Sequence, residues 1–190
     1  MTATARERIL AATRANHFEE NPLPTVPQFT GDASVERFTE VLQSIGGQIV
    51  RIPVGQPLAE VVQQLFPAAG PVASPLLPAT ITIDEQTPTA VLDTVDVAVL
   101  GGIFGVAENG CIWLPEANML HRALPLITQH LVLVLSQQNI VATMHQAYAL
   151  VTDVGDYGMF IAGPSKTADI EQSLVIGAHG ARSLTVLLTA

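Results

Sequence analysis

Two glycine-bearing segments near the C-terminus carry the side chains best suited to binding a small anion. Segment 163–167 reads Gly-Pro-Ser-Lys-Thr, and segment 177–182 reads Gly-Ala-His-Gly-Ala-Arg. Lys166 is the only lysine in a chain whose formal net charge is −9, so these segments hold two of its scarce cations. Ammonium, guanidinium, imidazole and hydroxyl groups are the donors that recognise carboxylates and phosphates. We therefore predict an anion-binding site formed by Ser165, Lys166, Thr167, His179, Gly180 and Arg182.

Glu108 and Arg122 are further candidates in the middle of the chain. Glu108 directly precedes Asn109-Gly110, a dipeptide typical of a tight turn between two strands, so its carboxylate should lie where a ligand can reach it. The same position equally suits a carboxylate that only binds nearby backbone N–H groups and holds the turn. Arg122 belongs to a polar loop, 115–122, and would bring another cation to the site.

Other catalytic arrangements have little support. A triad of Ser165, His179 and Asp169 lacks the Gly-x-Ser-x-Gly turn that exposes a nucleophilic serine. Cys111 begins an apolar segment, where a buried cysteine is normally unreactive. The five histidines show neither His-x₃-His nor Glu-x-x-His spacing, so no helical metal site is expected. The chain contains no Gly-x-Gly-x-x-Gly and no Walker A lysine motif.

A strand–helix–strand unit is expected to position the two segments. The apolar run 159–162 is typical of a short buried strand. Ser165 or Thr167 is a suitable cap for a helix that begins near Ala168, and a final strand is expected over 184–188. Parallel units of this kind bind ligands in a crevice at the carboxyl ends of their strands. We therefore expect the anion site at that edge of the sheet.

Several residues near this site are expected to play supporting roles. Asp169 and Glu171 would fall in the first turn of the helix, where the helix dipole stabilises carboxylates. The others break the preceding strand or form the turn after Glu108. The supporting residues are Gly163, Pro164, Asp169, Glu171, Asn109 and Gly110.

The rest of the chain alternates helical and strand patterns, as in an open α/β sheet. We expect helices over 4–16, 32–44, 58–66 and 142–151, and strands over 48–53, 72–74, 80–83, 95–100, 111–114 and 131–135. A composition of 48% hydrophobic and 13% charged residues fits strands that are buried on both faces. We predict an α/β fold with a mostly parallel open sheet and helices on both faces, formed by residues 32–190. Residues 1–31 would be a docked helical arm and a proline-rich linker.

Charge and composition limit the cofactors and partners. A net charge of −9 without a basic cluster argues against nucleic acid. No apolar run approaches the ~20 residues of a spanning helix, so membrane insertion is not expected. A single cysteine excludes an internal disulfide and an iron–sulfur site in this chain. The N-terminus lacks an apolar signal segment, so we expect a cytoplasmic protein without a cofactor of its own.

The same glycine-bearing segments resemble a known family. Segment 163–172, Gly-Pro-Ser-Lys-Thr-Ala-Asp-Ile-Glu-Gln, with the later Gly-Ala-His-Gly of 177–180, is similar to the C-terminal signature of the LUD-domain family, of the lactate-utilisation protein C (LutC, or YkgG) type. Segment 105–110, Gly-Val-Ala-Glu-Asn-Gly, resembles the family's Ala-Glu-Thr-Gly-Thr element. Asn109 and Cys111 stand in place of threonines, and Ala181 replaces the proline expected after His-Gly. The resemblance runs from about Val95 to the C-terminus.

This resemblance implies a fold like that of the NagB/RpiA/CoA-transferase-like proteins. It also implies an accessory subunit that acts beside iron–sulfur partners in the oxidation of L-lactate to pyruvate. Such a subunit would bind a small anionic metabolite, namely lactate, pyruvate or a phosphate-containing compound, while its partners hold the clusters. The alternative is a stand-alone enzyme of the CoA-transferase or sugar-phosphate-isomerase kind, with Glu108 as its catalytic residue. The residues alone leave both readings open.

Overall fold

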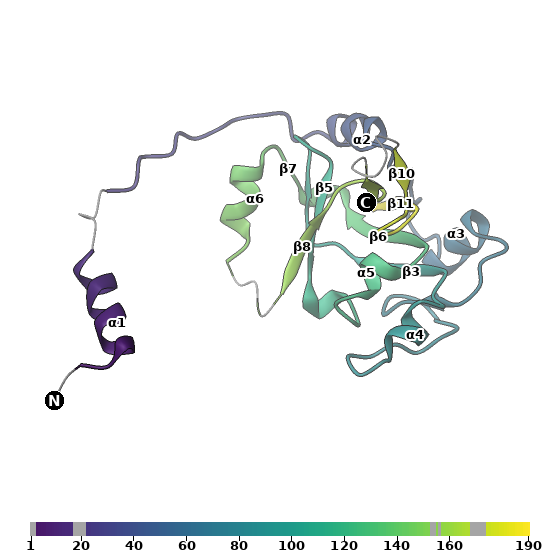
Figure 1. Cartoon of the computed structure of the whole chain (residues 1–190). Helices are drawn as coiled ribbons and strands as arrows, with labels where there is room; N and C mark the ends of the chain where they lie inside the picture. Colours follow the sequence, from purple (N-terminus) through teal and green to yellow (C-terminus); the bar gives the residue numbers. More distant parts are fainter. Residues whose placement is uncertain (1–2, 17–21, 153–154, 156, 168–173) are drawn as a thin grey trace.

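A five-stranded parallel sheet lies at the centre of the molecule (Figure 1). The computed structural model describes residues 3–16, 22–152, 155, 157–167 and 174–190. The strand order is β1-β11-β6-β3-β2, and each neighbouring pair is parallel. The strands are β1 (Gln48–Arg51), β2 (Val72–Ala73), β3 (Val97–Gly101), β6 (His130–Ser136) and β11 (Ser183–Thr189).

Helices cover both faces of this sheet because its strands are apolar on both sides. On one face, α3 (Leu58–Leu65) packs Val61 and Val62 against Val99 of β3. On the other face, α2 (Val35–Ser44) buries Phe38 and Leu42, and the short helices α4 (Thr89–Leu92) and α5 (Leu124–Ile127) join the same core. The predicted α/β fold, with a mostly parallel sheet and helices on both faces, is confirmed.

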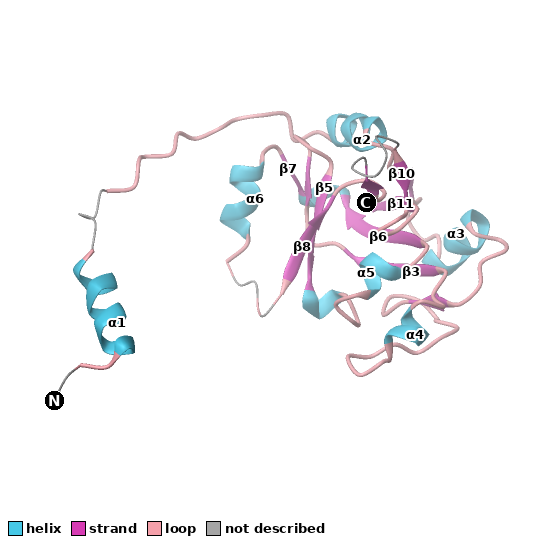
Figure 2. Cartoon of the chain, in the orientation of Figure 1, coloured by secondary structure: helices cyan, strands magenta, loops and turns pink. Residues whose placement is uncertain are grey.

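A second, four-stranded sheet packs on the α2 side of the first (Figure 2). Its order is β7 (Ile140–Val141), β4 (Gly105–Val106), β5 (Cys111–Pro115) and β8 (Gly158–Ile161). Along β5, Ile112 and Leu114 face the main core, whereas Trp113 faces α6 (Met144–Leu150) on the outer side. Both faces of β5 are therefore buried.

The predicted strand–helix–strand unit at the C-terminus is wrong. β8 pairs antiparallel with β5 in the second sheet, so it is not a neighbour of β11. Lys166–Thr167 forms β9, which pairs antiparallel with β10 (Val175–Ile176). Adjacent β-branched residues at 175 and 176 favour an extended conformation. The expected helix start at Ala168, with Asp169 and Glu171, lies outside the described residues.

Two smaller predictions also need correction. Helix α2 begins at Val35 and not after Asp32, because Ser34 is its cap and accepts the Arg37 N–H at 3.2 Å. Residues 80–83 form no strand of their own. Instead, the N–H groups of Thr80 and Ile81 both donate to the carbonyl of Val72. Two 3₁₀ turns, η1 (Glu116–Asn118) and η2 (Gln137–Asn139), complete the body.

The N-terminal arm is helical, as predicted, but it is not docked on its own domain. Helix α1 (Ala5–Ala15) has a capping box between Thr4 and Glu7 and no buried residue. An extended segment, 22–34, joins it to the body without forming a helix or strand, and Figure 1 shows α1 standing apart. None of the helices in the described parts of the chain has the length and hydropathy that a bilayer-spanning segment requires.

Candidate anion-binding site

The two glycine-bearing segments lie side by side. Ser165 donates its backbone N–H to the carbonyl of Ala181 at 2.9 Å, and its own carbonyl accepts the N–H of Gly177 at 3.1 Å. A β-carbon at Gly180 would lie 3.1 Å from Cβ of Ser165, so the absence of a side chain permits this close approach. Pairing of β9 with β10 returns the chain to this point. The expected proximity of the two segments is present in the structure.

A cavity of about 510 Å³ opens beside these segments. Its polar side chains belong to Ser165, Lys166, Thr167, His179 and Tyr157, and Gly180 contributes backbone. Among the described residues that line it, Lys166 is the only one with a permanent charge, and none is a carboxylate. The remaining wall is mainly apolar and comes from α5, β8 and the first residues of β6 and β11. A mainly apolar wall with a few polar groups is typical of a pocket for a small molecule.

The cavity lies at a different edge of the parallel sheet from the one that the sequence predicted. Leu131 and Leu184, which line it, are the second residues of the parallel strands β6 and β11. The cavity therefore borders the amino ends of the parallel strands, and the predicted crevice at their carboxyl ends is wrong. The reason is that 163–167 follows β8, which belongs to the second sheet, whereas 177–182 precedes β11.

Lys166 has a structural contact in addition to its place at the cavity. Its Nζ donates to the carbonyl of Ile45, the C-terminal cap of α2. The last carbonyls of a helix lack partners within the helix, and a cation there is favourable. An ammonium group carries three protons, so this hydrogen bond leaves two for a ligand. Gly163, with φ of +69°, packs on the same carbonyl, since a β-carbon there would lie 2.9 Å from it.

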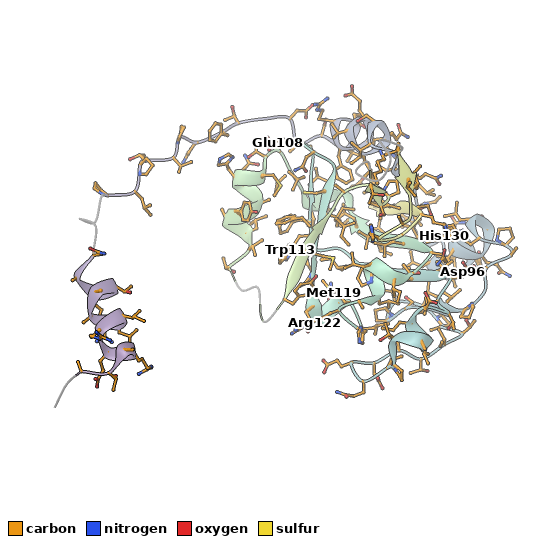
Figure 3. All side chains as sticks on the ribbon, viewed as in Figure 1. Asp96, Glu108, Trp113, Met119, Arg122 and His130 are labelled. Atoms are coloured by element: carbon orange, nitrogen blue, oxygen red, sulfur yellow. The ribbon has the colours of Figure 1, made fainter. Side chains whose placement is uncertain are left out.

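Glu108 does not line this cavity. The Asn109-Gly110 turn connects β4 to β5 as predicted, and Gly110 has a positive φ of +71°. The Glu108 carboxylate accepts the backbone N–H of Met144 at 2.8 Å, at the start of α6 (Figure 3). Asn109 similarly accepts the N–H of Cys111 at 3.1 Å. The structure thus matches the alternative in which Glu108 binds backbone and holds this corner.

The two arginines predicted for the site are also absent from the lining of this cavity. The guanidinium of Arg122 binds both carboxylate oxygens of Glu116 and lies 5.6 Å from the centre of the Tyr157 ring. This ion pair holds the pKa of Glu116 below its usual value. Figure 3 shows Arg122 and Glu108 at opposite ends of β5. The side-chain stem of Arg182 packs beside Gly177.

Cys111 and the histidines form no catalytic or metal-binding centre in the described part of the chain. Burial raises the pKa of the Cys111 thiol to about 11, and its Sγ lies 3.4 Å from Sδ of Met144. No group of three or more His, Cys, Asp or Glu side chains among the described residues is placed to hold a metal ion. Asp169 and Glu171, predicted to support the site, lie outside the described residues.

Sequence reasoning missed the apolar half of the cavity and its link to α2. Leu126 and Tyr157 lie outside the helices and strands that the residue pattern predicted, and Phe160 comes from β8. Ile45 acts through its backbone carbonyl, which residue types do not reveal. The only local signal in the sequence is the Gly46-Gly47 pair directly after Ile45, which favours the end of a helix.

Comparison with known proteins agrees with this fold. The family model described as LUD domain matches residues 83–189. Lactate utilization protein C of Shouchella clausii is 33% identical over 91 residues, which cover 45% of this chain and 40% of that protein. Lactate utilization protein C of Deinococcus radiodurans is 34% identical over 103 residues, covering 52% of this chain and 49% of that protein. The alignments thus span less than half the length of these relatives.

A crystal structure of a DUF162 family protein from Deinococcus radiodurans shares the fold. It superposes with a TM-score of 0.61 and 20% sequence identity, covering 82% of this chain and 96% of that one. Both glycine-bearing segments of the cavity and the Glu108 turn fall within residues 83–189. Because the family model matches more than half of the chain, this protein belongs to the LUD-domain family.

Proposed function

We propose that this protein is a LutC-like accessory subunit in the oxidation of L-lactate to pyruvate, and that its cavity binds a small anionic metabolite. The observation that carries the proposal is the shared cavity of Ser165, Lys166, Thr167 and His179. A carboxylate placed there would meet one ammonium, two hydroxyls and an imidazole. The names of the relatives supply lactate as the candidate substrate.

The shape of the cavity suits an anion with an organic part. Leu126, Met159 and Phe160 form an apolar wall opposite the polar groups. Its volume of about 510 Å³ exceeds what lactate alone occupies, so a phosphate-containing metabolite also fits. Glu108 lies outside this lining, so the alternative of a Glu108 nucleophile has no supporting contact at the cavity.

Thermal unfolding in the presence of lactate, pyruvate and phosphate tests the binding proposal. A ligand at ~100 times its Kd stabilises the folded state by about 2.7 kcal/mol. For a chain of this size, that shift raises Tm by roughly 5–10 °C. Lys166→Ala should remove the rise, whereas Arg182→Ala, with the same change of charge in the neighbouring segment, should retain it. No rise with any of the three compounds would contradict the binding proposal.

The subunit proposal has a separate test. Iron–sulfur subunits of a lactate-oxidising system should co-purify with this chain, and lactate oxidation should need both components. Lys166→Ala should lower the activity of the assembled complex without releasing the partner. Oxidation of lactate at the full rate by the partners alone would contradict an accessory role.

A further inference from the structure

A second cavity, of about 500 Å³, lies on the outer side of the second sheet. Trp113 of β5, Phe104 just before β4 and Val151 just beyond the end of α6 line it. Ile103 and Leu150 stand at its edge, with 44% and 53% of their surfaces exposed. Figure 3 shows Trp113 between the sheet and α6. A mainly apolar pocket of this kind suits apolar side chains supplied by another element. We call it the Trp113 cavity.

Helix α1 is a largely polar helix that carries two adjacent, exposed apolar residues. It has no buried residue, and Ile9 and Leu10 are 66% and 37% exposed. A helix of 11 residues is marginal on its own, because isolated helices shorter than ~12–15 residues are barely stable in water. Packing of Ile9 and Leu10 against another surface would stabilise the helix.

Charge favours the body of this protein as that surface. Three of the eight cationic residues, Arg6, Arg8 and Arg14, lie on α1, together with only one acidic residue, Glu7. The helix therefore carries +2, and the remaining five cations and 16 acidic residues give the rest of the chain −11. The two parts attract each other over distances up to a Debye length, about 8–10 Å at physiological salt.

The described part of the linker, residues 22–34, leads away from the body. Phe29 stacks on His145 of α6, with the ring centres 4.1 Å apart, and this contact holds the linker on α6. Upstream of it, Pro22, Pro24 and Pro27 favour a stiff extended conformation that resists folding back. Figure 1 shows α1 standing apart from the body, beyond α6. A neighbouring copy is the partner that this geometry favours.

We propose that two copies of this chain exchange arms, so that α1 of each inserts Ile9 and Leu10 into the Trp113 cavity of the other. Reciprocal exchange of an identical element gives a closed twofold dimer. Part of the attraction is electrostatic, because the helix and the rest of the chain carry opposite net charges, so the dimer should weaken as salt rises. It is independent of the anion-binding cavity.

Sedimentation of the full chain, together with Trp113 fluorescence, tests this proposal. The intact protein should be a dimer at micromolar concentration, and Ile9→Asp or Leu150→Asp should make it monomeric. Leu23→Asp is the matched control, because Leu23 is a linker residue that is 93% exposed and should not affect the dimer. All these side chains are solvent-exposed, so circular dichroism should show an unchanged fold.

A peptide of residues 3–16 provides a second measurement. Trp113 is the only tryptophan of the chain, so the peptide has no tryptophan fluorescence. Any change in this fluorescence therefore comes from the cavity. The peptide should shift Trp113 emission in Ile9→Asp protein and leave Leu150→Asp protein unaffected. A monomeric intact chain, a dimer that survives Ile9→Asp, or a peptide without effect would each overturn the proposal. A monomer whose Trp113 is already shielded would instead show that α1 binds its own body.

Discussion

Ser165 occupies the space that a side chain at Gly180 would need. A β-carbon at Gly180 would lie 3.1 Å from Cβ and 3.4 Å from Oγ of Ser165. The two residues come from opposite sides of the β9–β10 pair, and both line the anion-binding cavity. The hydrogen bonds of Ser165 to Ala181 and Gly177 hold the segments at this separation. The shape of the cavity therefore depends on the lack of a side chain at Gly180.

Gly180→Ala should push the two segments apart and weaken ligand binding by about tenfold, which corresponds to about 1.4 kcal/mol. Strain of the backbone does not contribute, because Gly180 is not among the glycines with positive φ. The measurement is the ligand-induced rise in Tm. Crowding should also lower the unfolding free energy of Gly180→Ala. Adding Ser165→Gly to this variant frees the space and should recover part of that loss. If the double variant is only as stable as the two separate losses predict, crowding is not the cause.

Lys166→Met should lower the unfolding free energy by about 0.3–1 kcal/mol even without ligand, because the carbonyl of Ile45 loses a cationic donor at the end of α2. Urea unfolding of the free protein measures this loss. Arg182→Met removes the same charge without touching α2 and should cost less. Equal losses of unfolding free energy in the two variants would mean that the change in net charge, and not the loss of the Ile45 contact, causes the destabilisation.

Glu108→Gln should lower the unfolding free energy by about 0.3–1 kcal/mol, because a charged acceptor at the N-terminus of α6 becomes neutral. The rise in Tm caused by ligand should remain unchanged, since Glu108 does not line the cavity. Loss of the ligand response in this variant would place Glu108 at the binding site and revive the enzyme alternative.

Cys111 should make stability fall at alkaline pH. Burial raises the pKa of its thiol from 9.0 to about 11. As pH rises, the unfolded chain releases this proton first, so the unfolded state is favoured. The contribution is fully present below pH 9.0 and is lost as pH rises through about 11. The difference in urea stability between the natural protein and Cys111→Ala should shrink over this interval, and a constant difference would contradict the raised pKa.

Native Cys111 should also react slowly with alkylating reagents, because the thiolate is the nucleophile and little of it forms while the residue is buried. Labelling at neutral pH should become fast only when denaturant unfolds the protein. Rapid labelling of the folded chain would show that the packing of Cys111 against Met144 opens readily.

Local residue patterns determined the central strands of the main sheet and the turn after Glu108. The apolar runs that became β3, β6 and β11 are buried on both faces, as a continuous apolar sequence requires. Asn109-Gly110 makes the turn between β4 and β5 because its residue types favour it. The two glycine-bearing segments were recognisable because their residue types are unusual in this acidic chain. Short-range preferences suffice for all these features.

Only the tertiary structure decided which of the candidate residues meet. Pairing of β8 with β5 moved the site to the amino ends of the parallel strands, and core packing of Ile112 and Leu114 fixed that arrangement. The same packing placed Glu108 on α6 and Lys166 on the end of α2. These contacts join residues 36 and 121 positions apart, so no local pattern encodes them. They are set by which apolar faces can be buried together.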